Sequence, residues 1–223
     1  ASDYAKSGRV AVYSGDDVQG GCIYKFISDR PNSLASGTLY AADTENGRWV
    51  ELSLNNPLLA QFGTLENILV HARDAAILAG ATPQDRPEDI ELSPHAPGAI
   101  FLTLTNNKKK ARPNYYGSIY KIQEADGDPL ALTFRGDTFL PGGPGHGHGA
   151  PFASPDNLAF DPQGNLWMSS DIWEGDVESG PYAGFGNNGL FVIPMRGPDA
   201  GAVIQVGHAP IDAELTGNTF APS

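Results

Sequence analysis

The stretch Arg86-Pro87-Glu88-Asp89-Ile90-Glu91-Leu92-Ser93-Pro94 has a shortened partner further along the chain, Ser154-Pro155-Asp156-Asn157-Leu158-Ala159-Phe160-Asp161-Pro162. In each copy a proline is followed by two residues with side-chain oxygen atoms, and a glycine and an apolar run follow closely. The same pattern twice indicates one structural unit used twice. We therefore expect metal-ligand or phosphate-handling chemistry at the same point of each unit.

Three glycines begin similar apolar segments that end in polar residues, at 8–16, 98–106 and 164–171. After a variable loop, each segment is followed by another apolar strand, near 23–26, 119–122 or 190–193. Repeated strand pairs with loops of unequal length are typical of the blades of a β-propeller.

Short apolar runs between Gly, Pro, Asn and Asp predict an all-β fold. The expected strands are 9–13, 22–28, 37–42, 49–52, 100–104, 118–123, 130–134, 158–160, 166–169, 189–194 and 202–206. One inserted helix is predicted near 65–78, with Thr64 as its N-cap and Gly80 at its end. Its expected apolar face is formed by Leu65, Ile68, Leu69, Ala72, Ala76 and Leu78.

The last residues resemble the beginning of another unit, because Phe220-Ala221-Pro222 falls where Phe160-Asp161-Pro162 does. We expect residues 1–223 to form a single partial β-propeller domain of about three blades, truncated within repeats at both ends. Edges of such a segment are exposed unless a partner covers them.

The net charge of -12 argues against binding nucleic acid through a broad basic surface. It fits a soluble exported protein or one that collects cations, and solubility alone explains it equally well. The single cysteine, Cys22, excludes an internal disulfide and Cys-based zinc sites. No apolar run is long enough for a membrane-spanning helix.

Hard oxygen donors near a propeller axis suit Ca²⁺ or another hard cation. The candidates from the repeat are Glu88, Asp89, Asp156, Asn157 and Asp171. The alternative is that such residues only cap turns between strands.

Three other groups of polar residues have two interpretations each. Arg86 either presents a fork of donors to a phosphate or pairs with a carboxylate. The pair Asp16-Asp17 binds a metal or forms a turn, and His146 and His148 either chelate a metal or belong to a mobile glycine-rich loop.

An ordered set of motifs resembles the PhoX-type alkaline phosphatase family from about Gly8 to the end of the chain. The motifs are Gly15-Asp16-Asp17 followed by Ile23-Tyr24-Lys25-Phe26, the stretch 80–91, Thr103-Leu104-Thr105-Asn106-Asn107, Pro113-Asn114-Tyr115-Tyr116-Gly117 and the stretch 154–161. The resemblance covers the C-terminal part of that family. It implies a β-propeller phosphomonoesterase with Ca²⁺ and Fe³⁺, exported to the periplasm or the extracellular space.

The resemblance also assigns roles to residues. Arg86 is expected to contact phosphate and Glu88 to act both in catalysis and as a metal ligand. The other implied metal ligands are Asp156, Asn157 and Glu214, with Asp16, Asp171 and Tyr116 as further candidates. The remaining iron ligands of the family belong to an N-terminal half, a possible partner for this segment, and Cys22 does not match the family's cysteine ligand.

The implied reaction is metal-assisted hydrolysis of phosphate monoesters, with Arg86 stabilising the transition-state charge. The isolated segment would hold only part of that site. Two other functions remain open: a non-catalytic calcium-binding propeller module, and another propeller hydrolase such as a phytase-like or lactonase-like enzyme.

Overall fold

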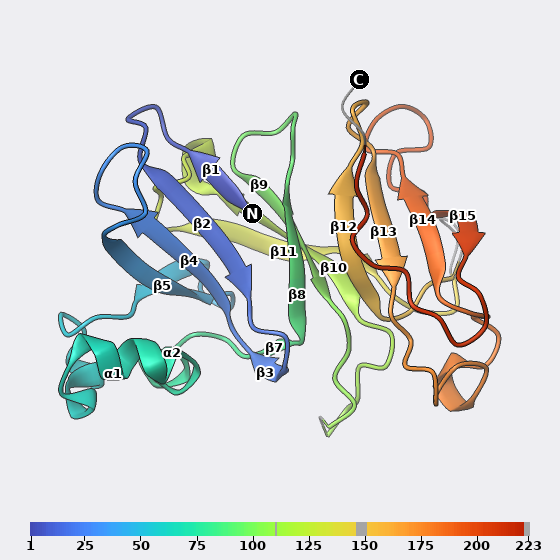
Figure 1. The fold of residues 1–223 in the computed structure, drawn as a ribbon, viewed down its shortest axis with the longest axis horizontal. Coiled ribbons are helices and arrows are strands. Elements are labelled where there is room, and N and C mark those ends of the chain that lie inside the picture. Colours follow the sequence, from blue (N-terminus) through green and yellow to red (C-terminus); the bar gives the residue numbers. More distant parts are fainter. Residues whose placement is uncertain (110, 146–150, 221–223) are drawn as a thin grey trace.

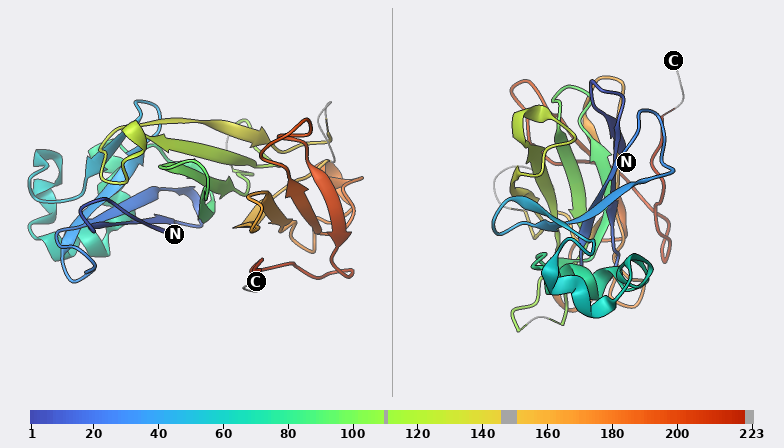
Figure 2. Two further views of the ribbon diagram at one scale, coloured as in Figure 1. Left: turned by 90° about the horizontal axis from the view of Figure 1, so that it is seen from above. Right: turned by 90° about the vertical axis from the view of Figure 1, so that its left-hand side faces the viewer.

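The computed structural model describes residues 1–109, 111–145 and 151–220. These residues form three antiparallel sheets of four or five strands, which follow one another in sequence order, and one small two-stranded sheet. The three larger sheets lie side by side in Figure 1 and fan along an open arc in Figure 2. Each of the three is an antiparallel meander, as in a propeller blade. The predicted all-β, propeller-like architecture of about three blades is therefore confirmed.

We number the blades along the chain and give their strands in spatial order. Blade 1 has the order β1-β2-β4-β5-β6, blade 2 the order β8-β9-β10-β11 and blade 3 the order β12-β13-β14-β15. Their bounds are β1 Ser2–Tyr4, β2 Val10–Gly15, β4 Ile23–Ser28, β5 Gly37–Asp43, β6 Arg48–Glu51, β8 Pro87–Leu92, β9 Ala99–Leu104, β10 Ser118–Glu124, β11 Phe134–Pro141, β12 Pro155–Phe160, β13 Leu166–Ser170, β14 Gly189–Ile193 and β15 Ile204–His208.

Shorter elements connect the blades. Strands β3 (Gln19–Gly21) and β7 (Gln84–Asp85) pair with each other beside the N-terminal end of β8. An insert of one 3-10 helix and two α-helices covers one end of blade 1: η1 Pro57–Phe62, α1 Leu65–Val70 and α2 Ala72–Ala79. Two further 3-10 turns are η2 Ala125–Gly127 and η3 Gly180–Tyr182. Within the described ranges, no helix is long and apolar enough to cross a membrane.

Strand β9 shows how the blades pack. All six of its residues are buried, and successive side chains point to opposite faces of the sheet. Ile100 and Leu102 join the core shared with blade 1, whereas Ala99 and Phe101 join the core shared with blade 3. The continuous apolar run at 99–104 is therefore the pattern of a strand covered on both faces.

A buried ion pair also joins blades 1 and 2. Lys25 Nζ lies 2.7 Å from Glu124 Oε1, and both side chains are fully buried. The same carboxylate accepts hydrogen bonds from Tyr13 OH and Trp49 Nε1. Burial lowers the pKa of Lys25 and raises that of Glu124, although the attraction within the pair opposes both shifts. The pair therefore orients the two blades rather than adding much stability.

The structure corrects the predicted helix at 65–78. The helix breaks at His71 into α1 and α2, although Thr64 caps its start and Gly80 ends it as expected. Leu65, Leu69 and Leu78 are more than a third exposed. Ile68 and Ala76 pack on blade 1 as predicted, and Ala75 and Ala79 complete that face in place of the leucines. Alanines that pack closely on a sheet lack the strong apolar signal on which the prediction relied.

Two strand predictions were also wrong in position. The expected strand at 130–134 begins as a turn, in which the Asp128 side chain accepts a hydrogen bond from Leu130 N–H. Thr133 forms only an isolated bridge with Arg48, and β11 begins at Phe134. The last strand begins at Ile204 rather than at residue 202. Strand β8 was not predicted, since its polar residues Glu88, Asp89 and Glu91 were interpreted as part of a turn.

Candidate metal centre

The two copies of the proline motif form equivalent β-bulges in the inner strands of blades 2 and 3. In β8, Pro87 pairs with Leu104 and the next pair is Ile90 with Leu102. In β12, Pro155 pairs with Ser170 and the next pair is Leu158 with Met168. Two residues of each inner strand therefore stand opposite one residue of the neighbouring strand.

The residue before each proline has a left-handed backbone, with φ of 57° at Arg86 and 50° at Ser154. Non-glycine residues seldom adopt this conformation, and strained residues of this kind cluster at functional sites as well as in tight turns. The structural equivalence predicted from the repeat is thus present in the backbone. The repeated element is a bulged strand, however, and not a turn between strands.

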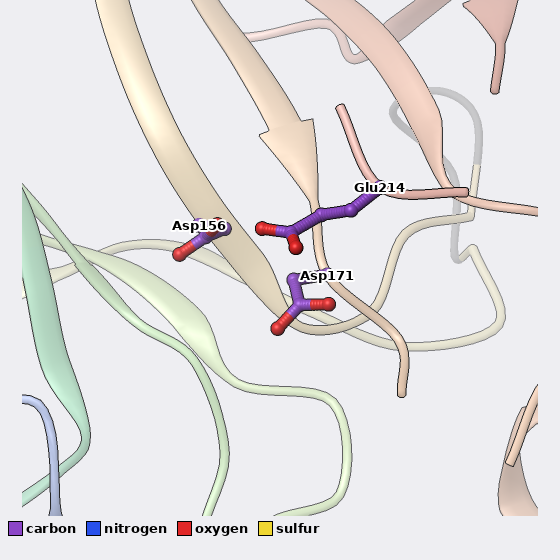
Figure 3. Close-up of side chains that lie close together, drawn as sticks. All are labelled: Asp156, Asp171 and Glu214. Atoms are coloured by element: carbon purple, nitrogen blue, oxygen red, sulfur yellow. The ribbon is translucent and has the colours of Figure 1, made fainter. Parts of the chain in front are cut away.

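The bulge of β12 brings Asp156 into a group of three carboxylates. Asp171 follows β13, and Glu214 comes from the segment after β15. One oxygen from each of the three side chains lies within 4.8 Å of the others, and Figure 3 shows the three side chains close together, with Glu214 extending toward Asp156. Asp156 is buried, Asp171 is half-buried and Glu214 is exposed. The group therefore extends from the interior to the surface.

Glu88 supplies a fourth carboxyl group from blade 2. The Glu88 side chain lies within hydrogen-bond reach of Asp156, so a protonated Asp156 donates to it. Thr105 Oγ1 donates to Glu88 Oε2 at 2.9 Å and holds this carboxylate in place. We refer to Glu88, Asp156, Asp171 and Glu214 as the acidic cluster.

The acidic cluster is electrostatically unfavourable as it stands. Burial, together with the negative charges of Glu88, Asp171 and Glu214, raises the pKa of Asp156 to about 9. Burial and the charge of Glu214 also raise the pKa of Asp171. Asp156 Oδ1 is buried and accepts no hydrogen bond from the described residues. A buried carboxylate without donors normally requires a bound cation or a proton.

The residues of the acidic cluster suit a hard cation. Carboxylate oxygens are the ligands that Ca²⁺ prefers, and a metal ion reverses the local preference for protonation. A cavity of about 150 Å³ adjoins Asp171 and Glu214, and it is also lined by Glu174 and Asp212. The donor set, the lack of a partner for Asp156 Oδ1 and the adjoining space therefore fit a metal site.

Arg86 lies beside the acidic cluster, but its ion-pair partner is Asp17. Arg86 Nε and Nη2 donate to the two Asp17 carboxylate oxygens at 2.8 and 3.0 Å. Burial by itself would lower the pKa of Arg86, but the pair with Asp17 and the charges of Glu88 and Asp171 raise it. The guanidinium is thus permanently charged and lies near the carboxyl groups of Asp17, Glu88 and Asp171.

Three of the predicted metal ligands lie elsewhere or are already engaged. Asp16 pairs with Arg73, and Arg73 Nη2 lies 2.7 Å from Asp16 Oδ1, so Asp17 rather than Asp16 faces the cluster. Asn157 Oδ1 accepts a hydrogen bond from Gly217 N–H. Tyr116 packs against Tyr182 and Phe185. Neighbouring residues in these loops and strands point in different directions, and the sequence does not distinguish them.

His146 and His148 lie outside the described residues, as do Ala221 and Pro222. Phe220 is described and packs edge-on against Trp167, with ring centroids 5.5 Å apart. In blade 2 the corresponding contact is between Phe101 and Phe160, at 5.7 Å. Phe220 therefore packs on Trp167 of blade 3 as Phe160 packs on Phe101 of blade 2.

Sequence reasoning assigned no orienting role to several residues that shape the site: Thr103 and Thr105 were not candidates, and Asp17 was considered only as a metal ligand or a turn residue. Thr105 orients Glu88, Asp17 orients Arg86, and Thr103 Oγ1 donates to the backbone carbonyl of Asp156 at 2.7 Å. The signal for the threonines was weak, because they are buried polar residues at the end of an apolar strand. Their partners come from other strands and cannot be identified from spacing.

Comparisons with known proteins show the family and the fold of this chain. The family model of alkaline phosphatase PhoX matches residues 2–223. A solved structure, Pseudomonas fluorescens PhoX in complex with vanadate, a transition state analogue, superimposes with a TM-score of 0.81 at 31% sequence identity. The match covers 96% of this chain and 44% of that chain. A comparison with curated proteins found no match.

Proposed function

This chain belongs to the PhoX alkaline phosphatase family, and we propose on that basis that it contributes one side of the active site of a metal-dependent phosphomonoesterase. The similar Pseudomonas fluorescens enzyme was solved with vanadate, a transition state analogue. Vanadate resembles the geometry of phosphoryl transfer, so a phosphate monoester is the proposed substrate class. The chain spans 44% of that enzyme, so activity is assigned to the protein that contains a complete site.

The buried carboxylate of Asp156 carries the proposal. Its Oδ1 atom has no hydrogen-bond donor among the described residues, and its neighbours are the like-charged Glu88, Asp171 and Glu214. A structural role alone would place donors or basic residues around such a group. The nearby Arg86 instead pairs with Asp17. Metal binding therefore accounts for the arrangement better than packing does.

In the proposed site, Asp156, Asp171, Glu214 and Glu88 hold cations, and Arg86 contacts the phosphoryl oxygens of the substrate. Arg86 would stabilise the charge that develops on the equatorial oxygens in the transition state. Asp17 keeps its guanidinium oriented through two hydrogen bonds. When bound, the metal ions supply charge neutralisation and lower the pKa of an attacking oxygen.

We infer Ca²⁺ and Fe³⁺ as the metals from the family resemblance, and the all-oxygen donor set supports hard cations of this kind. Cys22 makes no contribution, because it is buried in the core between blade 1 and the helical insert. Any further iron ligands would come from outside residues 1–223. We accordingly propose that these residues form part of a larger propeller, completed by an N-terminal half.

Export to the periplasm or to the extracellular space is part of the same proposal. It follows from the family resemblance and not from a feature of residues 1–223. The acidic composition is compatible with it but does not require it. Cell fractionation of the native host would test this point separately from the chemistry.

The function is tested by assaying phosphomonoester hydrolysis by the full-length protein with calcium and iron supplied. We expect Glu88→Gln to lower kcat by at least about 100-fold, in the range that single electrostatic contacts in active sites contribute. The control is Glu91→Gln on the same strand, which lies outside the acidic cluster and should leave turnover unchanged. Equal turnover of Glu88→Gln and the wild type would refute the assigned role.

Metal analysis and a substrate panel distinguish the alternatives. Iron together with calcium and turnover of phosphate monoesters supports the proposal. Calcium binding without turnover would indicate a non-catalytic calcium-binding propeller module. Preference for phytate or a lactone would indicate one of the other propeller hydrolases.

A further inference from the structure

The β12 bulge that carries Asp156 is held in place mainly by hydrogen bonds to side chains of blade 2. The ladder between β12 and β13 is interrupted between Pro155 and Leu158, which leaves Asp156 and Asn157 outside its regular pairing. Blade 2 supplies hydrogen bonds to Asp156 within this gap and to Leu158 directly after it. Thr103 Oγ1 donates to the Asp156 carbonyl oxygen at 2.7 Å, and Leu158 N–H donates to Asp89 Oδ2 at 2.8 Å.

Thr103 and Asp89 are themselves oriented by their own blade. Asp89 N–H donates to Thr103 Oγ1 at 3.0 Å, and Ile90 N–H donates to Asp89 Oδ1 at 2.8 Å. The Thr103 side chain is fully buried. A hydroxyl group has one proton to donate, and the short contact directs it to the Asp156 carbonyl. The two side chains are therefore pre-positioned for the neighbouring blade.

The repeat provides an internal comparison in blade 3. Asn157 takes the place of Asp89, and its Oδ1 accepts a hydrogen bond from Gly217 N–H. Ser169 takes the place of Thr103 opposite the bulge. The Ser169 hydroxyl is buried but has no hydrogen-bond partner among the described residues. The Thr103 hydroxyl of blade 2 thus bonds to the following strand β12. The corresponding hydroxyl of blade 3, that of Ser169, makes no such bond within the described residues.

We propose that Thr103 and Asp89 are positioning residues that lock the β12 bulge to blade 2 and so hold the Asp156 carboxylate in the acidic cluster. Asp89, one of the candidate metal ligands from the repeat, instead accepts hydrogen bonds from the backbone N–H groups of Ile90 and Leu158. In this proposal Thr103 and Asp89 both act through the backbone of residues 156–158. The inference rests on the proposed function for the identity of the bound cation. The lock itself concerns only contacts within this chain.

The first experiment measures Ca²⁺ affinity by calorimetry in the full-length protein. Partners that orient a metal ligand typically change metal affinity by about 10–100-fold. We expect Thr103→Val to weaken Ca²⁺ binding by about that factor, whereas Thr103→Ser, which keeps the hydroxyl, restores it. The matched control is Ser169→Ala in blade 3, which should bind Ca²⁺ like the wild type. A folded Thr103→Val variant with wild-type affinity would overturn the proposal.

The second experiment needs no metal. Amide hydrogen exchange at Leu158 is followed in the chelated protein for the wild type, Asp89→Ala and Asp89→Asn. We expect faster exchange in Asp89→Ala and near-normal protection in Asp89→Asn, because asparagine keeps an acceptor oxygen. Unchanged protection in Asp89→Ala would refute the lock even if Thr103→Val fails to fold. If the wild-type protein binds no Ca²⁺ but shows the expected exchange pattern, the proposed function is refuted and the positioning role of Asp89 is not.

Discussion

Glu88 and Asp156 are equivalent residues of two successive blades, and their carboxyl groups face each other. Each is the first residue after the proline of its bulge, and the bulges lie on adjacent inner strands. Side chains at equivalent points of neighbouring blades converge toward the propeller axis, so an acidic residue repeated in sequence becomes an acidic pair in space. Burial is the main reason why the pKa of Asp156 is raised, and the facing Glu88 carboxyl group raises it further.

Replacing the ionisable Asp156 should stabilise the protein at neutral pH in the absence of metal. Because the pKa of Asp156 is raised to about 9 in the folded protein, folding at pH 7 requires this carboxyl group to take up a proton. In Asp156→Asn the amide can donate to Glu88 without that proton. We expect a gain of about 1 kcal/mol in a chelator, in line with other relieved charge clusters, or about 2–4 °C in Tm. Thermal unfolding with EDTA and with Ca²⁺ checks this, and the variant should lose the stabilisation by Ca²⁺ that linkage predicts for the wild type. A lower Tm in EDTA would contradict the electrostatic account.

Breaking the buried ion pair between blades 1 and 2 should be costly. Lys25→Met leaves the Glu124 carboxylate buried without its cation, and such single removals destabilise proteins by about 3–5 kcal/mol. The double variant Lys25→Met, Glu124→Leu should recover most of that loss. Denaturant unfolding of both variants measures the difference. If the double variant is no more stable than Lys25→Met, the pair is not the cause of the loss.

Gly15 is predicted to be intolerant of any side chain because blade 2 approaches it closely. A Cβ atom there would lie 2.3 Å from the carbonyl oxygen of Pro87 and 2.9 Å from that of Glu88. Gly15→Ala should therefore displace the β8 bulge and cost about 1–3 kcal/mol, as overpacking does, with weaker Ca²⁺ binding. Gly207→Ala is the matched control, since its Cβ would be 4.0 Å from its nearest neighbour. Equal stability of the two variants would argue against the close approach.

The turn between β12 and β13 should give the protein a defined sensitivity to acid. Burial would raise the pKa of Asp161, but hydrogen bonds from the Trp167 and Asn165 side chains and from the backbone outweigh it and lower the pKa. A group whose pKa is lower in the folded than in the unfolded state stabilises the protein fully at pH values above its unfolded-state pKa, which is about 4 for Asp. This stabilisation is lost as the pH falls through the folded-state pKa.

Asp161→Asn should therefore be less stable than the wild type at neutral pH, by about 1.5–3 kcal/mol for hydrogen bonds to a charged group. The difference should shrink steadily below about pH 4. Unfolding measured from pH 7 to pH 2 tests this, with the exposed Asp199→Asn as control. A difference that persists at pH 2 would mean that packing and not charge is responsible.

Much of the fold could be predicted because its signals are local. The run Ala99–Leu104 is apolar enough to indicate a doubly buried strand, and Thr64 and Gly80 bound the helical insert as capping rules require. Strand β8 was missed because Glu88 and Asp89 occupy a bulge, where polar residues interrupt the alternation typical of strands. The buried pair of Lys25 and Glu124 could not be found at all, since its members are 99 residues apart.

By itself, the sequence determined that a proline-led acidic unit recurs, that each unit precedes an apolar strand, and that the repeated strands form blades. These are properties of short segments, whose turns and periodicity depend on neighbouring residues. Only the tertiary structure decided that Asp156, Asp171 and Glu214 converge, that Asp17 rather than Asp16 holds Arg86, and that Asn157 binds the following segment. The physical reason is that the site forms where successive blades pack together, and the blade geometry sets which side chains meet there.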